Sequence, residues 1–180
     1  MTAITPSETR LPEADTPSHK KSVVLFIAGL LAMIIGFGAM AGGVFGAWYT
    51  WDQATAQDVV TPDDAVIPDT PVRGPFTMWA QADIINHHQL SNTDGLYYAQ
   101  MDRTVPAVDE NGEAILDENG EAVMVPNEAR ASWLNATTLT TALNLGILSY
   151  ALAAFAFVTG LTLGAVGFVF LYIRRKAVLL

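Results

Sequence analysis

Few residues in this chain could carry chemistry, and the closest group of them is the pair His87 and His88 with Asp83. Neighbouring residues on a helix point about 100° apart, so the two rings do not converge on one metal ion. Asp83 and His87 are four residues apart and would share a face, but two ligands rarely make a metal site. We therefore predict no catalytic residue, no metal and no cofactor. A metal-dependent enzyme that uses Asp83 and His87 remains an alternative.

The composition excludes further function classes. The sequence has no cysteine, which removes disulfides, iron–sulfur clusters and thiolate metal sites. No Walker loop, Gly-x-Gly-x-x-Gly or Gly-x-Ser-x-Gly motif is present. The formal net charge is −9, whereas nucleic-acid binding requires a basic face, so we expect no nucleic-acid partner.

The first of two uncharged blocks covers 25 residues, 23–47, and is followed at once by Trp48, Tyr49 and Trp51. A helix needs about 20 apolar residues to cross a bilayer, and aromatic rings gather at its interfaces. We predict a transmembrane helix over residues 22–51. The alternative is a cleaved signal peptide with Ala39-Met40-Ala41 as its cleavage site. The apolar run continues past that site, which favours the transmembrane helix.

The second block, residues 131–173, is 43 residues long, about twice the length of one span. Two spans with a turn would leave Arg174, Arg175 and Lys176 outside, against the positive-inside rule. One span places them in the cytoplasm beside Lys20 and Lys21. We predict one helix over residues 131–173, starting near residue 127, with its span at about 149–173 and both termini cytoplasmic. Its Thr- and Asn-rich first half would stand outside the bilayer.

Glycines within both blocks repeat at intervals of four. This spacing is typical of helix faces on which a missing side chain lets another backbone approach closely. The partner of such a face could be the other helix of this chain or another subunit. The alternative is that glycine is simply common in transmembrane helices. We predict helix packing at Gly38, Gly42, Gly46, Gly160 and Gly164.

The segment between the blocks, residues 52–130, holds 15 acidic and 3 basic residues, and we place it outside the cytoplasm. Its first part, residues 53–73, reads as extended chain lying over a surface. Gly74-Pro75 opens a predicted helix over residues 76–90, because proline suits the first helical turn. Its broad apolar face requires cover. A second short helix is expected at residues 96–101.

An internal repeat, Asp-Glu-Asn-Gly-Glu-Ala, begins at Asp109 and again at Asp117. Asn-Gly favours type I′ turns, so residues 104–127 are predicted as an exposed hairpin insert. The glycine spacing does not match a twelve-residue calcium loop.

Together these features predict a mainly α-helical integral membrane protein with two transmembrane helices, the second extended outside the bilayer. A small extracytoplasmic helix-and-loop segment, with the hairpin insert, would connect them. Residues 1–21, rich in Pro, Thr, Ser and Glu, are predicted as a disordered cytoplasmic tail, and residues 174–180 as a cytoplasmic end.

The chain resembles a family of small actinobacterial membrane proteins associated with the respiratory supercomplex of cytochrome bcc and aa-type cytochrome c oxidase. The resemblance covers most of the chain except the tail and the insert. The mass of the chain, 19.3 kDa, is also near the 20 kDa of the family's accessory subunit. The resemblance is carried by Gly74-Pro75-Phe76, Gln81-Ala82-Asp83-Ile84-Ile85-Asn86, His88, Tyr98, Asp102-Arg103, Arg130 and Asn135-Ala136.

The resemblance implies an accessory subunit without a redox centre, whose partners are other membrane subunits of the supercomplex and phospholipid. Family members are often labelled aromatic ring-opening dioxygenases, and the scarce histidines give that label no support. We expect interface residues at Phe76, Trp79, Asp83, His88 and Arg103. A free-standing, membrane-anchored binding or sensor protein remains the alternative from another class.

Overall fold

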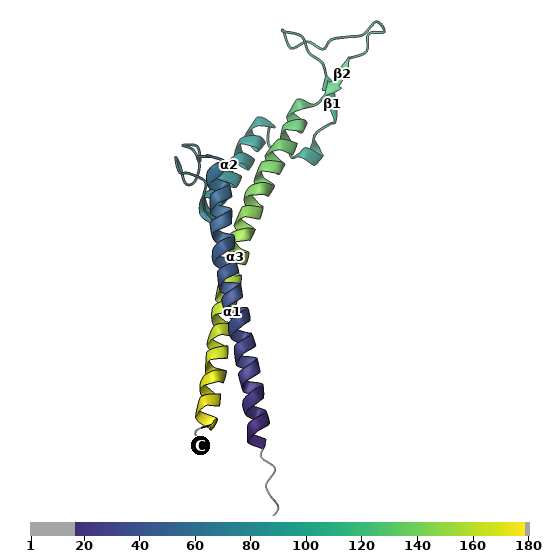
Figure 1. Cartoon of the computed structure of the whole chain (residues 1–180). Coiled ribbons are helices and arrows are strands. Elements are labelled where there is room, and N and C mark those ends of the chain that lie inside the picture. Colours follow the sequence, from purple (N-terminus) through teal and green to yellow (C-terminus); the bar gives the residue numbers. More distant parts are fainter. Residues whose placement is uncertain (1–16, 179–180) are drawn as a thin grey trace, which may run out of the picture. The chain divides into compact units, whose positions relative to one another are not determined.

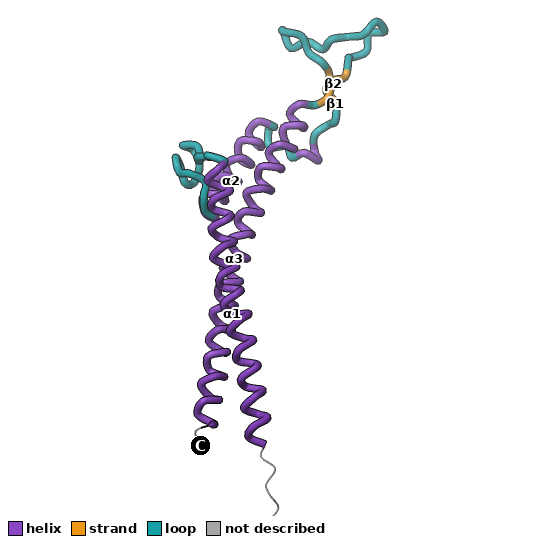
Figure 2. The backbone as a smooth tube through the Cα atoms, viewed as in Figure 1, coloured by secondary structure: helices purple, strands orange, loops and turns teal. Residues whose placement is uncertain are grey.

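The structure, a computed structural model, describes residues 17–178, and most of them are helical (Figures 1 and 2). The elements follow in the order α1 (Pro17–Ala56), α2 (Pro75–Asn92), a 3₁₀ turn (Tyr98–Gln100), β1 (Thr104–Pro106), β2 (Met124–Pro126) and α3 (Glu128–Val178). They form two compact units. The helix-pair unit contains residues 17–41 and 157–178, and the middle unit is Gly42–Ala156.

Two helices are long and apolar enough to cross a membrane, over Ser22–Ala56 and Glu128–Lys176. The second block is one uninterrupted helix, so the single-helix prediction is confirmed and the alternative of two helices with a turn is wrong. No proline interrupts residues 128–178, and every backbone N–H in the long run can therefore find its partner four residues back.

The first helix is longer than predicted at both ends, because α1 covers 17–56 rather than 22–51. Pro17 suits a first helical turn, and residues 52–56 contain no glycine or proline to end the helix. The helix ends just before Asp58, whose φ is +49°. Of the predicted tail, residues 1–16 lie outside the described residues, and residues 17–21 belong to α1.

In the helix-pair unit, α1 and α3 run antiparallel and touch through glycines spaced seven residues apart (Figure 1). A Cβ atom added to Gly36 would lie 2.7 Å from the carbonyl oxygen of Gly160, and one added to Gly167 would lie 2.7 Å from that of Gly29. Real Cβ contacts are essentially never this short, so the two backbones have room only for glycine. An interval of seven keeps the contact on one side of each helix when the pair supercoils left-handedly.

The predicted four-residue glycine rows are only partly used inside the chain. Gly160 and Gly164 lie against Gly36, whereas a Cβ on Gly38 or Gly42 would meet no atom within 4 Å among residues 17–178. Gly46 makes only ordinary contact, since its added Cβ would lie 3.7 Å from the Cβ of Ala153. The contact with α3 uses Gly29 and Gly36 of α1 instead, at an interval of seven, and packing of Gly38 and Gly42 against another subunit stays a prediction.

In the middle unit, α2 packs on α3 through apolar and amide contacts. The side chains of Met78, Ala82 and Ile84 are buried, and the sulfur of Met78 lies so near Gly146 that a Cβ there would approach it to 2.7 Å. The Gln89 amide donates a hydrogen bond to Ser132 Oγ at 2.6 Å. The cover that the apolar face of this helix requires is thus supplied largely by this chain.

The loop between α1 and α2 is folded rather than extended, which corrects the prediction for residues 53–73. Of the predicted segment, residues 53–56 belong to α1. The buried Thr61 then closes the loop on itself. Its hydroxyl donates to the Ile67 carbonyl at 2.5 Å and accepts from the Thr70 amide at 3.0 Å. A bridge between Val60 and Pro71 completes the closure. The prolines and aspartates that suggested extended chain instead form tight turns.

The predicted second short helix is only a 3₁₀ turn, Tyr98–Gln100. The insert does form an antiparallel pair, β1 with β2, but each strand has three residues and the rest is mostly loop (Figure 2). Its turns are not type I′, because Gly112 and Gly120 adopt positive φ of 83° while their asparagines do not. The cause is an aspartate at the start of each repeat.

Asp109 shows how this turn is held. Its carboxylate accepts hydrogen bonds from the amides of Asn111 and Glu113, both at 2.9 Å. These bonds keep the central residues in the right-handed region and leave the left-handed position to the glycine. The backbone hydrogen bonds from Glu113 and Asn111, in that order, also lower the pKa of the Asp109 carboxyl below its ordinary value. Asp117 repeats the arrangement.

The glycine contact generates a first prediction. Gly160→Ala should destabilise the helix pair by about 1–3 kcal/mol, because the added methyl overpacks against backbone that cannot give way. The matched control is Gly38→Ala, whose methyl meets open space and which should be neutral or stabilising by up to about 1 kcal/mol through helix propensity. Unfolding of the full chain by dodecyl sulfate in dodecyl maltoside micelles measures both. Equal effects of the two substitutions would contradict the contact.

Candidate interaction surfaces

The exposed side of α2 is the first candidate surface, and it gathers three of the predicted interface residues. Phe76, Trp79 and Asp83 follow at intervals of three and four and so share one exposed face of the helix. Phe76 is 77% exposed and Trp79 is 49% exposed. Large rings left in solvent on a helix that is otherwise well packed are typical of a protein-binding face.

Hydrogen bonds at the start of α2 hold this face in place. The amides of Arg73 and Gly74 both donate to the Thr77 hydroxyl, at 3.1 and 3.2 Å. Pro75 occupies the first helical position, where its missing N–H costs nothing. From α3, the Tyr150 hydroxyl donates to the Arg73 carbonyl at 2.6 Å. The end of the helix that carries Phe76 is thereby tied to α3.

His88 lies elsewhere, in an ion pair with Asp64 of the preceding loop. The His88 Nε2 atom is 2.6 Å from the Asp64 carboxylate, and both side chains are about half exposed. The side-chain hydrogen bond to His88 is the main cause that lowers the pKa of the Asp64 carboxyl below its ordinary value. Sequence reasoning missed Asp64, because 24 residues separate the partners and no periodicity links them.

Arg103 does not join the α2 face either. It is exposed at the start of the insert, where its carbonyl accepts a hydrogen bond from the Asn127 amide at 3.0 Å. The Asn127 side chain also donates to the Asp102 carbonyl at 3.0 Å. Arg103 therefore belongs to the base of the insert. Its role and that of His88 as interface residues stay predictions.

The pair Asp83 and His87 is exposed on α2. Among residues 17–178, no group of three or more His, Asp or Glu side chains lies close enough together to hold a metal ion. The two side chains thus have no third ligand within the part of the chain that the structure describes.

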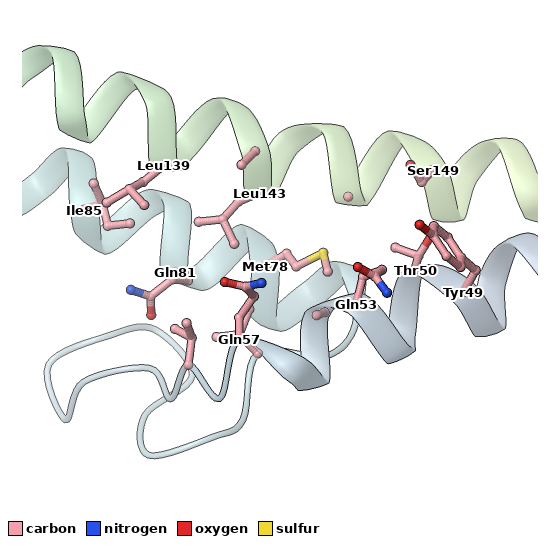
Figure 3. Close-up of a pocket in the computed structure, with 15 residues that line it drawn as sticks. Tyr49, Thr50, Gln53, Gln57, Met78, Gln81, Ile85, Leu139, Leu143 and Ser149 are labelled. Atoms are coloured by element: carbon pink, nitrogen blue, oxygen red, sulfur yellow. The ribbon is translucent and has the colours of Figure 1, made fainter.

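A cavity of about 650 Å³ is the second candidate site, between the end of α1, the loop, α2 and α3 (Figure 3). Leu139 and Leu143 of α3 and Met78 and Ile85 of α2 give it aliphatic walls. An amide edge is formed by Gln53, Gln57 and Gln81. Sequence reasoning missed this site, although one signal for it exists. Tyr49, Gln53 and Gln57 follow at intervals of four, just after the first uncharged block, and so share one face of the helix.

A third candidate surface is the side of α1 that carries Gly38 and Gly42. It is open within the described chain, as shown above. Close by in sequence, Phe45 packs against Trp48 and Tyr49, with ring centroids 5.8 and 6.1 Å apart. The open glycines thus precede an exposed aromatic cluster on the same helix.

The fold is that of a mainly helical protein with two long apolar helices of the kind that cross membranes and a middle unit that exposes large aromatic side chains. Comparisons with protein-family models, with curated proteins and with solved structures found no match to this chain.

The ion pair generates a second prediction. The pKa of Asp64 is lowered in the folded chain, so the pair stabilises the loop above the ordinary carboxyl pKa of 3.8 and loses this contribution as pH falls through the lower folded value. Carbon-13 NMR of labelled Asp carboxyls should show a titration midpoint below 3.8 that returns toward it in His88→Ala. The neighbouring His87→Ala should shift it less, because His87 is the smallest of the causes. Equal shifts in both variants would argue against the pair.

Proposed function

We propose that this chain is a non-catalytic accessory subunit of the actinobacterial cytochrome bcc–aa oxidase supercomplex, which supports its assembly or stability. It crosses the plasma membrane with α1 and α3, keeps both termini in the cytoplasm, and exposes residues 52–130 on the other side. It contacts neighbouring subunits through helix packing and through the middle unit. Phospholipid is its other partner.

The observation that carries the proposal is a pair of faces, one on α1 and one on α2, that contacts within the described residues leave open. Gly38 and Gly42 leave a side of α1 bare, and Phe76 and Trp79 leave large rings exposed on α2. Glycine costs about 1 kcal/mol relative to alanine inside a helix, so open glycines in a helix need a reason outside this chain. A helix of another subunit supplies that reason, because small residues allow close approach.

The residues of the resemblance support the choice of complex. Several of them fix the middle unit. Gly74-Pro75 starts α2, and the Arg130 guanidinium stacks over the Tyr98 ring at 3.9 Å from its centroid. The backbone carbonyl of Asp102 accepts a hydrogen bond from the Asn127 side chain at the base of the insert. Others in the same run, Phe76 and Asp83, are exposed and free to meet a neighbour. The insert lies outside the resemblance and is attached at the start of α3.

The topology rests on the basic ends of the two helices. Arg174, Arg175 and Lys176 follow the second uncharged block, and Lys20 and Lys21 precede the first. In the helix-pair unit the Arg174 guanidinium lies 4.3 Å from the centroid of the Phe26 ring, and its Nε is 3.4 Å from the Ser22 hydroxyl. The basic residues thus lie at one end of the antiparallel pair, as the positive-inside rule requires of a cytoplasmic end.

A membrane-anchored binding protein is the second candidate function, and the cavity of the middle unit favours it. The two candidates differ in what accompanies the purified chain. An accessory subunit is recovered with cytochromes, whereas a free-standing binding protein is recovered alone.

The third prediction follows from this difference. Affinity purification of the tagged full chain from actinobacterial membranes in mild detergent should recover both cytochrome bcc and the aa-type oxidase, identified by haem spectra and mass spectrometry. A monodisperse chain without cytochromes would overturn the supercomplex proposal. Iron, copper and zinc analysis of the chain purified alone tests the enzyme alternative, which would require a stoichiometric metal.

The fourth prediction assigns the contact surfaces. Gly38→Val and Trp79→Ala should each reduce cytochrome recovery about tenfold or more, because a clash or the loss of an aromatic anchor weakens an interface strongly. The control is Gly112→Ala in the insert, which strains a turn far in sequence from both surfaces and should leave recovery unchanged. Normal unfolding of the isolated variants must accompany the loss. Full recovery with both surface variants would show that neither face binds the complex.

A further inference from the structure

The lining of the middle-unit cavity fits an apolar ligand with an uncharged polar part. None of its lining residues is Asp, Glu, Lys, Arg or His. Aliphatic side chains from α2 and α3 form the wall in Figure 3, and the amides of Gln53, Gln57 and Gln81 face it from the other side. The volume of about 650 Å³ is in the usual range for ligand sites. A charged metabolite would find no counter-charge here.

Gln81 has one polar side-chain atom without a partner. Its side-chain oxygen is buried, yet it has no hydrogen-bond partner within residues 17–178. A buried polar atom without a partner is unfavourable, so such atoms in folded proteins are normally satisfied by a ligand, by water or by another group. This oxygen is not accessible from the cavity, so the amide nitrogen is the atom of Gln81 that can donate to a ligand such as an ester carbonyl.

The position of the cavity indicates where its ligand comes from. One end is formed by Tyr49 and Thr50, in the aromatic cluster that ends the first uncharged block, and by Ser149, where the span of α3 begins in the proposed topology. From Ser149 the lining continues along α3 to Leu139, ten residues or about 15 Å of helix. In the proposed topology the lining thus begins at the outer membrane surface and continues away from it.

We propose that this cavity binds one acyl chain of a membrane phospholipid, with the glycerol-ester region of that lipid hydrogen-bonded to the glutamine edge. The chain lies along Leu139, Leu143 and Met78, and Gln81 contacts the ester or head group. The site rests on the membrane placement given under Proposed function but not on the supercomplex. It provides a reason for α3 to continue as an apolar helix well beyond the length of one span.

The test uses the full chain in vesicles of equal parts phosphatidylethanolamine and phosphatidylglycerol. A trace of phosphatidylethanolamine carries a photoreactive diazirine in one acyl chain. After irradiation, mass spectrometry should find lipid adducts on cavity residues such as Met78, Ile85 and Leu143, in addition to those on the spans. Adducts confined to residues of the spans would overturn the proposal, whatever the variants show.

A matched pair of variants on α3 separates cavity binding from general lipid contact. Ala142 lines the cavity, and its neighbour Thr141 is exposed without lining it. Ala142→Trp should reduce the cavity adducts about tenfold or more because the indole occupies the ligand volume, and Thr141→Trp should leave them unchanged. Equal adducts in both variants would overturn the site. Circular dichroism confirms that both variants keep the helical content of the parent chain.

Two further outcomes keep this proposal apart from the others. If alkaline carbonate releases the chain from vesicles, the chain is not inserted, and the membrane placement and the lipid site are overturned together. An inserted chain that recovers no cytochromes but carries the cavity adducts would overturn the supercomplex alone. Native mass spectrometry should show a monomer with one bound lipid. A dimer without lipid would identify a second copy as the occupant and refute the acyl-chain site.

Discussion

The close approach of two glycine backbones is the constraint on which the helix-pair unit depends. Lipid tails are as apolar as the helices, so burial of apolar surface cannot hold such a pair together, and van der Waals contact must do so. Gly36 and Gly160 supply that contact because neither has a side chain that would separate the two backbones. The seven-residue interval then fixes the register as well, because a slip of α1 by one residue would bring Ile35 or Phe37 to the place of Gly36. This contact sets which other faces of α1 remain open.

In the middle unit, α3 carries two further small residues at contacts with other helices. Gly146 and Ala153 continue the seven-residue interval of Gly160 and Gly167 along α3 in sequence. At Gly146 the missing side chain admits Met78 of α2 rather than a residue of α1. One periodic feature of α3 therefore serves two different partners. A cavity with aliphatic walls and an amide edge lies beside this contact, since Met78 and Gly146 both line it.

Features set by local chemistry could be predicted from the sequence. The absence of proline predicted one continuous α3, and Gly74-Pro75 predicted the start of α2 to within a residue. Features that depend on partners distant in sequence could not. Thr61 closes its loop through residues up to nine positions away, and His88 pairs with Asp64, 24 residues before it. The turn type failed for a local reason, since the Asp109 carboxylate overrides the preference of Asn-Gly.

The six glycines of α1 differ in their burial, although the sequence alone does not separate them. Gly29, Gly36 and Gly43, at intervals of seven, are buried. Gly38 and Gly42 are exposed, so contacts within the described chain do not explain them. Each open glycine gives up helix propensity of about 1 kcal/mol relative to alanine, and alanine would fit at both positions without a clash. A second helix packed against Gly38 and Gly42 would compensate for the lost helix propensity, because glycine lets its backbone approach more closely than alanine does. The glycines that α3 leaves unused are thus the strongest argument within this chain for a neighbour.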